Sequence, residues 1–368
     1  MIINKVSYIA ELNSIPNSAY TIHVLKMCDN FKKLGCDVKL YLPYSLYKNT
    51  NKIKKKYLLK NYFLIENILK KKINNFFDRA RFGYLCARQI RRNTLIITRS
   101  FWASFFLILM KKKHYLEFHS NLVGITKLLF IYLNFIHSKY IIKKIFISKS
   151  LKKKFKINNK DSLVLHDGVD LDNFIKNKIN RIKNLKNFYY IGGFYKGRGI
   201  NLIINLAKEF PNGNFILVGS KNLLSDKKFY SKLKNVKIEK YYHYNKIPTL
   251  LKKADVLLMP YEKKVNVNSK NLNTANYCSP IKMFEYLAAG KIILSSNLPG
   301  ISEVLKDNFN CFLSKGHDLK DWITLTQKIF ALDNKKIYSV QKNSLKTAEK
   351  FTWLLRCQKI LNDKRIVL

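Results

Sequence analysis

Acidic side chains are scarce in this sequence. Its 368 residues include 23 Asp and Glu against 69 Lys and Arg, a formal net charge of +46. No cluster of carboxylates predicts a metal site. The positive excess favours an anionic partner such as a membrane surface, a nucleic acid or a phosphorylated substrate. Compositional drift is the alternative explanation, because Lys, Asn and Ile are abundant along the whole chain.

The sequence also lacks paired cysteines and long apolar runs. Its six scattered cysteines include no CxxC spacing, so neither a zinc site nor a disulfide framework is indicated, and a reducing cytoplasm fits. The N-terminal MIINKVSYIAEL has no signal-peptide apolar core. The longest uncharged apolar runs, Ser100–Met110 and Leu128–Ser138, are shorter than the roughly 18–20 residues that span a bilayer. We therefore expect a cytoplasmic protein, at most peripheral on the inner face of the cytoplasmic membrane.

What is present is the pattern of an α/β protein. Hydrophobic residues make up 47% of the chain, and its length suits two domains. The chain opens with a predicted strand at Val6–Ala10, a helix from Ser18 to Leu34 and a strand at Val38–Leu42. This βαβ order predicts a parallel sheet. His23 lies on the first helix, where we expect a solvated or packed side chain.

Residues 51–150 are strongly basic, with 22 Lys and Arg against 3 Asp and Glu. Apolar residues recur at helical spacing from Leu58 to Phe76, and Lys54–Lys56 and Lys70–Lys72 flank them. A basic helix with such a stripe can lie in an anionic membrane surface. A core-facing helix with a solvated basic back is an equally good interpretation.

A candidate site residue follows the short predicted strand Tyr115–Phe118. This strand places His119 at its carboxyl end, where ligands bind in open α/β sheets. A histidine bonded to a loop is the structural alternative.

A glycine-rich turn opens the second half of the chain. Gly192–Gly199 lies between a predicted strand, Phe188–Ile191, and a helix, Ile200–Phe210. Such a turn lets the backbone approach a phosphate, although alone it is a weak signal.

The most informative stretch is SPIKMFEYLAAGKIILSSNLPGISEV, residues 279–304. Ser279 as N-cap and Pro280 at the first helical position predict a helix that ends at Gly290. A buried strand at Ile292–Leu294, a turn at Asn297–Gly300 and the start of a second helix are expected to follow.

Two features of the predicted helix suit a nucleotide. Its N-terminus suits a phosphate. Glu285, on the same helix, could accept hydrogen bonds from both hydroxyls of a ribose. A capped αβ unit with an exposed Glu285 is the alternative.

Several motifs resemble those of GT4-type glycosyltransferases, the glycosyl transferases group 1. The pattern S-P-x-K-x-F-E-Y-x-A-A-G-K followed by S-x-x-P-G-I-x-E-V is similar to the donor-site signature of this family. HDGVDLDNF, residues 166–174, resembles its interdomain hinge, and LEFHSN resembles its strand-end E-x-H motif. The resemblance covers nearly the whole chain.

This resemblance implies the GT-B fold, two Rossmann-like domains facing a cleft. Residues 1–174 are expected to form an acceptor-binding domain and residues 175–350 a nucleotide-sugar-binding domain. Residues 351–368 are expected to form a helix that crosses back to the first domain.

The resemblance also assigns roles to residues. The glutamate at the position of Glu285 holds the ribose of the nucleotide sugar, and the histidine at the position of His119 contacts the transferred sugar. Arg198 matches the lysine of the donor-phosphate loop, and the helix start from Ser279 to Lys282 is expected to assist it.

Two positions depart from the family pattern. Gly193 stands where an arginine is usual, and Lys196 or Lys282 could supply the missing cation. Tyr277 stands where many members have a second glutamate.

The function that the resemblance implies is transfer of a hexose from a nucleotide sugar to an acceptor, with retention at the anomeric carbon and no metal or other cofactor. A bacterial lipid-linked, lipopolysaccharide or polysaccharide acceptor is preferred, and no nucleic acid is expected. A nucleotide-sugar epimerase of the same fold is one alternative. A non-catalytic basic nucleic-acid-binding protein is another, although no RNP-type aromatics or GXXG motif support it.

Overall fold

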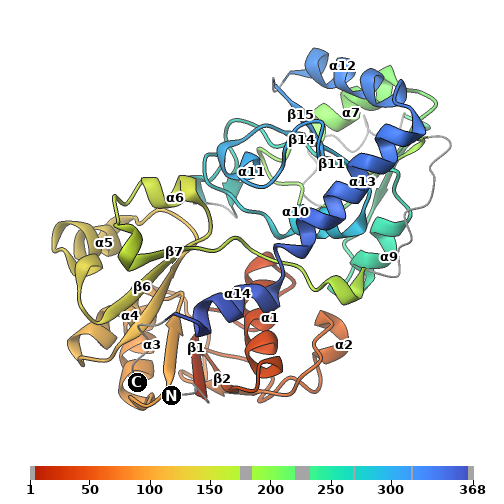
Figure 1. Cartoon of the computed structure of the whole chain (residues 1–368). Helices are drawn as coiled ribbons and strands as arrows, with labels where there is room; N and C mark the ends of the chain where they lie inside the picture. The colour runs from red at the N-terminus through yellow and green to blue at the C-terminus, as the bar shows by residue number, and fades with distance from the viewer. Residues whose placement is uncertain (1–4, 175–184, 220–232, 268–269, 316–317, 364–368) are drawn as a thin grey trace. The chain divides into compact units, whose positions relative to one another are not determined.

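The computed structural model describes residues 5–174, 185–219, 233–267, 270–315 and 318–363 (Figure 1). The chain divides into two compact α/β units. The first runs to His166 and includes the segment from Trp353, and the second is Asp167–Thr352. The sequence-based division after residue 174 differs from this one, because most of the HDGVDLDNF segment joins the second unit.

The first unit contains a seven-stranded parallel sheet of order β3-β2-β1-β4-β5-β6-β7. In parallel sheets the carboxyl ends of all strands share one edge, where loops and side chains meet. The strands are β1 (Lys5–Ile9), β2 (Asp37–Leu42), β3 (Leu64–Asn67), β4 (Leu95–Thr98), β5 (His114–Phe118), β6 (Ile141–Phe146) and β7 (Ser162–Val164).

The helices of this unit alternate with the strands, and the C-terminal helix α14 (Trp353–Leu361), blue in Figure 1, packs against the red α1. A Cβ at Gly83 would lie 2.6 Å from the Trp102 carbonyl carbon, so only glycine permits the close packing of α3 on α4 there. The other helices are α1 (Ala19–Lys33), α2 (Lys54–Tyr57), α3 (Phe76–Gln89), α4 (Phe101–Leu109), α5 (Gly124–Lys127), η1 (Leu128–Tyr132), η2 (Phe135–His137), α6 (Lys149–Lys153) and η3 (Asn159–Asp161).

The second unit contains a six-stranded parallel sheet of order β10-β9-β8-β11-β14-β15. Its core includes Tyr190, Ile203, Leu258 and Trp322. The strands are β8 (Asn187–Ile191), β9 (Asn214–Val218), β10 (Val236–Glu239), β11 (Val256–Met259), β14 (Ile292–Ser296) and β15 (Phe312–Ser314), with a separate pair of β12 (Asn266–Val267) and β13 (Lys270–Asn273).

Its helices are η4 (Leu171–Asn173), α7 (Ile200–Glu209), η6 (Tyr244–Lys246), α9 (Ile247–Lys252), α10 (Ile281–Ala289), α11 (Pro299–Ser302), α12 (Leu319–Phe330) and α13 (Asn334–Glu349). Both sheets confirm the predicted fold class of two Rossmann-like units. None of the described helices is long and apolar enough to cross a membrane.

One sequence-based prediction of local structure in the first unit is wrong. No helix runs from Leu58 to Phe76: α2 stops at Leu58, whose φ of 52° is left-handed, and Ile65 lies in the extended edge strand β3. The same apolar residues therefore fill a strand and its connections, which the helical spacing could not reveal. The predicted start of a second helix after the strand is confirmed by α11, which begins at Pro299 within the expected turn Asn297–Gly300.

His114 is buried at the start of β5. Its Nε2 lies 2.7 Å from the Ser104 hydroxyl, and its Nδ1 lies 3.0 Å from the Lys112 carbonyl oxygen, to which it can donate. Burial lowers the pKa of His114 from 6.5 to about 4. The folded chain thus keeps this imidazole neutral at pH values where the unfolded chain protonates it.

We expect His114 to make the protein acid-sensitive. Between pH 6.5 and pH 4 the unfolded state binds a proton that the folded state does not, so the free energy of unfolding should fall by about 3 kcal/mol. His114→Gln should remove this contribution in urea unfolding measured across that range. His137→Gln, at an exposed position, should leave the pH dependence of the unfolding free energy unchanged. If the unfolding free energy changes equally with pH in the wild type and in both variants, the prediction is contradicted.

Candidate active site

The glycine-rich turn of the second unit joins β8 to α7. Gly197 and Gly199 have φ of 88° and 67°, and a Cβ at Gly199 would overlap the Pro260 carbonyl oxygen, so glycine is required. This tight path places the Arg198 guanidinium 4.8 Å from the centre of the Tyr261 ring, just beyond the carboxyl end of β11.

Lys282 reaches the same turn from the first turn of α10. Its Nζ lies 4.0 Å from the Tyr190 ring centre. A Cβ at Gly192 would lie only 2.5 Å from the same Nζ atom. This nitrogen is buried and has no hydrogen-bond partner among the described residues. Burial, and next the charge of Arg198, hold the pKa of Lys282 well below its usual range. Two basic side chains, Arg198 and Lys282, thus lie close together at the strand ends of this unit.

Glu285 lies one turn further along α10. It is 6% exposed, so the interpretation of an exposed glutamate is wrong. The hydroxyl of Tyr244 hydrogen-bonds to its carboxylate. Burial, and next the charge of Glu285, raise the pKa of Tyr241 to about 12. Glu285 is therefore a charged group held among tyrosines at the edge of this pair of basic side chains.

The other predicted residues of this unit occupy different environments. The Gly193 carbonyl oxygen accepts a hydrogen bond of 2.9 Å from Tyr190, and the side chain of Lys196 is exposed. Of the two candidates for the missing cation, the structure brings Lys282 to the turn. Tyr277 is fully buried.

The predicted capping of α10 by Ser279 is wrong. The N-cap is Pro280, whose ψ of 134° is extended, so the helix begins one residue later and has no side-chain cap. Ser279 is buried just before it.

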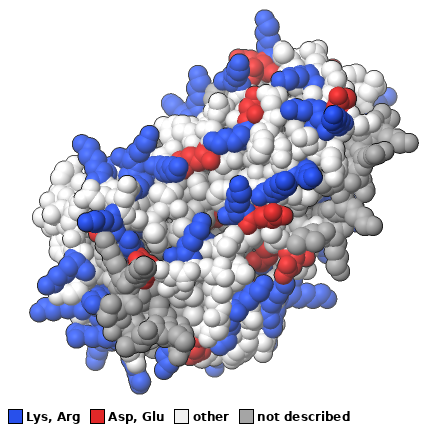
Figure 2. Space-filling model, viewed as in Figure 1, with Lys and Arg blue, Asp and Glu red and all other residues white. Residues whose placement is uncertain are grey.

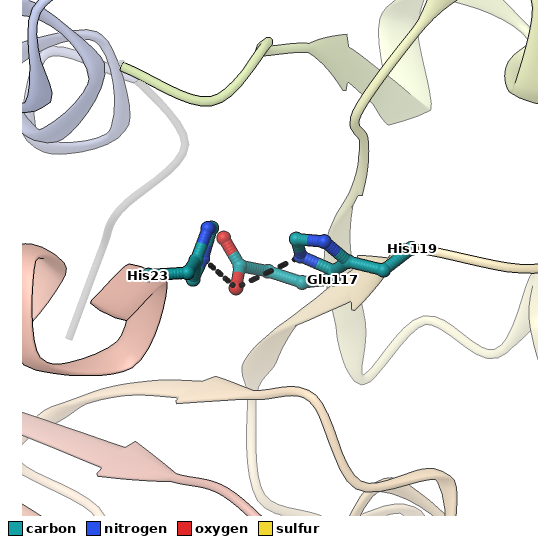
Figure 3. Close-up of side chains that lie close together, drawn as sticks. All are labelled: His23, Glu117 and His119. Atoms are coloured by element: carbon teal, nitrogen blue, oxygen red, sulfur yellow. Dashed lines mark hydrogen bonds and ion pairs between the residues drawn. The ribbon is translucent and has the colours of Figure 1, made fainter. Parts of the chain in front are cut away.

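His119 follows β5 in the first unit and forms a cluster with Glu117 and His23 (Figure 3). Its side chain is 17% exposed, and its Nε2 lies 3.7 Å from Glu117 Oε2, too far for a hydrogen bond. The rings of His119 and His23 meet edge to face with centroids 4.6 Å apart. Burial, and next the charge of Arg99, lower the pKa of His119 to about 3, so its imidazole is neutral near pH 7.

Glu117 is the centre of this cluster. Its Oε2 accepts from the Tyr8 hydroxyl and lies 3.2 Å from His23 Nε2, and its Oε1 accepts from Arg356 Nη2 at 2.8 Å. Arg356 also donates to the carbonyl oxygens of Leu165 and, at 2.8 Å, His166. Burial alone would raise the pKa of Glu117, but His23 and Arg356 hold it well below its usual range.

The cluster has the composition of a metal site, because one ligand atom from each of His23, Glu117 and His119 lies within 4.8 Å of the others. However, both Glu117 oxygens already accept hydrogen bonds, one of them from a guanidinium. A metal ion would have to displace these donors and tolerate the charge of Arg356. The arrangement therefore suits a hydrogen-bonded network better than a metal ion.

Sequence reasoning missed most of this network. Glu117 and His119 are two residues apart at the end of a strand, so one signal was present, because such residues point to the same face. His23 is buried and bonded to Glu117, which agrees with the packed interpretation. Nothing in the local sequence identifies Tyr8 or Arg356, because they reach Glu117 only through the fold.

Part of the chain matches a known protein family. Residues 172–344 match the family model described as glycosyl transferases group 1. This part of the chain, just under half of its length, is similar to that family. The match covers the Arg198 turn, Lys282 and Glu285. It does not cover His119.

One curated relative is TuaH of Bacillus subtilis (strain 168), a candidate teichuronic acid biosynthesis glycosyltransferase. It is 23% identical over 219 residues, which are 57% of this chain and 53% of TuaH. The chain thus spans about half the length of this relative.

Solved structures of glycosyltransferases share the whole fold. The glycosyltransferase from Rickettsia africae ESF-5 matches with a TM-score of 0.75 and 14% identity over 98% of this chain and 97% of its own. Anabaena Alr3699/HepE in complex with UDP-glucose matches with a TM-score of 0.69 and 13% identity over 97% and 98%. The fold is therefore the GT-B fold expected from the sequence.

We expect the buried Glu117–Arg356 pair to be strongly coupled. Glu117→Gln or Arg356→Met alone leaves one buried charge without its partner and should lower the free energy of unfolding by about 3–5 kcal/mol. The double variant should lose much less than the sum of the two, as measured by urea unfolding.

The half-exposed pair Lys39–Glu66, 3.5 Å apart, provides the control and should contribute about 0–1 kcal/mol. Additive losses at Glu117 and Arg356 would contradict the predicted coupling.

Proposed function

We propose that the protein transfers a sugar from a nucleotide-sugar donor to a glycan acceptor with retention at the anomeric carbon. The observation that carries this proposal is the pair of Arg198 and Lys282 beside Glu285, within the part of the chain that matches glycosyl transferases group 1. Two basic side chains at the strand ends suit the diphosphate of a donor, and Lys282 Nζ is buried without a hydrogen-bond partner among the described residues.

Each of these residues receives a role. Arg198 and Lys282 would stabilise the departing diphosphate, so no metal or other cofactor is needed. Gly193 and the start of α10 after Ser279 would let the backbone approach it. The side chain of Lys196 is exposed, so at most it would contact the phosphates from the solvent side. Glu285 would accept hydrogen bonds from the ribose hydroxyls.

His119 is proposed to contact the transferred sugar. A histidine with a pKa of about 3 is neutral near pH 7, so it suits a hydrogen bond to a sugar hydroxyl rather than proton donation as an imidazolium. Glu117 lies 3.7 Å from its Nε2, and both Glu117 oxygens accept hydrogen bonds from other residues.

The similar proteins support a choice of donor and acceptor classes for this proposal. Alr3699/HepE was solved with UDP-glucose, which makes a UDP-hexose the first donor to test. TuaH is linked by name to teichuronic acid, which favours a polysaccharide or lipid-linked acceptor.

Turnover of a panel of UDP-, GDP- and ADP-sugars in the presence of EDTA, with and without glycan acceptors, tests the proposal by mass spectrometry. Acceptor-dependent release of the nucleotide supports a transferase, and nuclear magnetic resonance of the product reports retention. Conversion of the donor alone would indicate an epimerase. No turnover together with tight nucleic-acid binding would favour the non-catalytic alternative.

Glu285→Gln should weaken UDP binding by about one to two orders of magnitude. The variant keeps the shape of the side chain and can still form neutral hydrogen bonds, but it loses their charge assistance, a total of about 1.5–3 kcal/mol. UDP titration by calorimetry measures this loss.

A UDP analogue without the ribose hydroxyls is the control. It should bind the wild type weakly and show little further loss in the variant. Unchanged UDP affinity in a folded Glu285→Gln protein would rule out the ribose contact.

We further propose that the first unit binds an anionic membrane surface on the cytoplasmic side. Large apolar side chains are exposed along α5 and η1, and Phe130 and Ile136 anchor this segment in the core. Figure 2 shows a pale surface over α5 with blue Lys and Arg side chains around it. The exposed side chains are Val123 (50%), Ile125 (43%), Leu128 (47%), Ile131 (37%), Tyr132 (67%) and Leu133 (57%).

This segment replaces residues 58–76 as the expected membrane contact. Apolar side chains that enter the interface, with lysines near lipid phosphates, bind anionic bilayers together. Lys127 and Lys139 are exposed within or next to the segment and can provide the charge.

Ile125→Ser/Leu133→Ser should reduce cosedimentation with vesicles of phosphatidylglycerol several-fold, and high salt should weaken binding of the wild type because it screens the lysines. Leu46→Ser/Phe77→Ser removes apolar side chains that are 74% and 77% exposed elsewhere in the unit and is the matched control. Equal binding of both double variants, or equal binding to neutral vesicles, would argue against this surface.

A further inference from the structure

Arg99 is a basic residue at the carboxyl end of β4, next to the strand that carries His119. Its backbone N–H donates to the Ile9 carbonyl oxygen at 3.1 Å, which fixes the chain at the strand end. The guanidinium lies 4.0 Å from the centre of the Tyr20 ring, so one face of its plane is covered by an aromatic side chain. This stacking fixes the direction in which its N–H groups point.

The Arg99 side chain has no acid partner in the part of the chain that the structure describes. Its Nη1 is buried and makes no hydrogen bond to a described residue. Two nearby carboxylates bind other groups: Glu11 accepts from Ser100 at 2.6 Å and pairs with Arg79 at 2.8 Å, and Glu117 is bonded to Arg356. A guanidinium N–H that is removed from water without an acceptor is costly.

His119, which lies beside Arg99, also has a polar side-chain atom without a hydrogen-bond partner among the described residues. Its Nε2 is also buried without a hydrogen-bond partner among the described residues, although the ring keeps 17% of its surface exposed. The charge of Arg99 acts on His119, since it is, after burial, the next cause of the low pKa of that histidine. Two polar atoms, Arg99 Nη1 and His119 Nε2, therefore lie at neighbouring strand ends without a hydrogen-bond partner in the part of the chain that the structure describes.

We propose that Arg99, with His119 beside it, binds an oxyanion of the glycan acceptor, a phosphate or a carboxylate. A guanidinium presents paired N–H groups that match two oxygens of either group. The nine-residue helix α4 begins two residues after Arg99 and adds the positive end of its dipole. The inference rests on the proposed function only in identifying the ligand as the acceptor.

The test compares three sugars that differ in charge: glucose 1-phosphate, glucuronic acid and glucose. Their binding to the full chain, saturated with UDP to occupy the donor site, is measured by saturation-transfer nuclear magnetic resonance. The wild type should prefer one or both charged sugars to glucose. Arg99→Gln should weaken that binding about tenfold or more, because a charge-assisted pair is lost.

Two further variants make the result specific. Arg99→Lys keeps the charge but loses the paired geometry, so its affinity should fall between those of the wild type and Arg99→Gln; it also carries the test if Arg99→Gln does not fold. Arg91→Gln removes an exposed arginine of the same unit and should change nothing.

The outcomes separate the possible sources of the anion. Preference for the phosphate indicates a phosphorylated acceptor, preference for glucuronic acid indicates an acidic sugar, and preference for both indicates a general oxyanion site. Equal binding of all three sugars, or an equal loss in Arg91→Gln, would overturn the inference. UDP binding reports on the second unit separately, so loss of UDP binding in the wild type would count against the proposed function instead.

Discussion

The first unit depends on one buried carboxylate. Glu117 is ionised in the core, and an ionised group that is removed from water must be matched by donors. Those donors come from β1, α1 and α14, the two ends of the chain. The network that satisfies Glu117 thereby holds the last helix against the first strands and fixes the strand end from which His119 projects.

The second unit has the opposite electrostatic arrangement. Lys282 and Arg198 are brought together by a turn that requires glycine, and tyrosine rings lie against them, with the carboxylate of Glu285 at their edge. Aromatic faces lower the cost of burying a cation without cancelling its charge. The charge of these basic side chains can therefore pair with an anionic ligand, whereas a direct salt bridge with a protein carboxylate would have neutralised it.

The sequence predicted the alternation of strands and helices well, because parallel strands are buried on both faces and stand out as short apolar runs. It failed between Leu58 and Phe76, where apolar residues at helical spacing belong to an edge strand and its connections. Glu285, Arg198 and Lys282 could be proposed from the sequence because the turn and helix that hold them are local. Tyr8, Arg99 and Arg356 were not, because their environment exists only once distant strands and the last helix have assembled.

The basic side chains that give the chain its large positive charge fall into two groups with different explanations. Lysines at exposed positions are surrounded by water and cost little, so composition alone can explain their number. That explanation fails for Arg99 Nη1 and Lys282 Nζ, which are buried without a hydrogen-bond partner among the described residues. Burying such groups lowers stability, and mutation would readily remove them if they did nothing. The informative part of the charge is therefore the small fraction inside the two units, at the strand ends where anionic substrates can neutralise it.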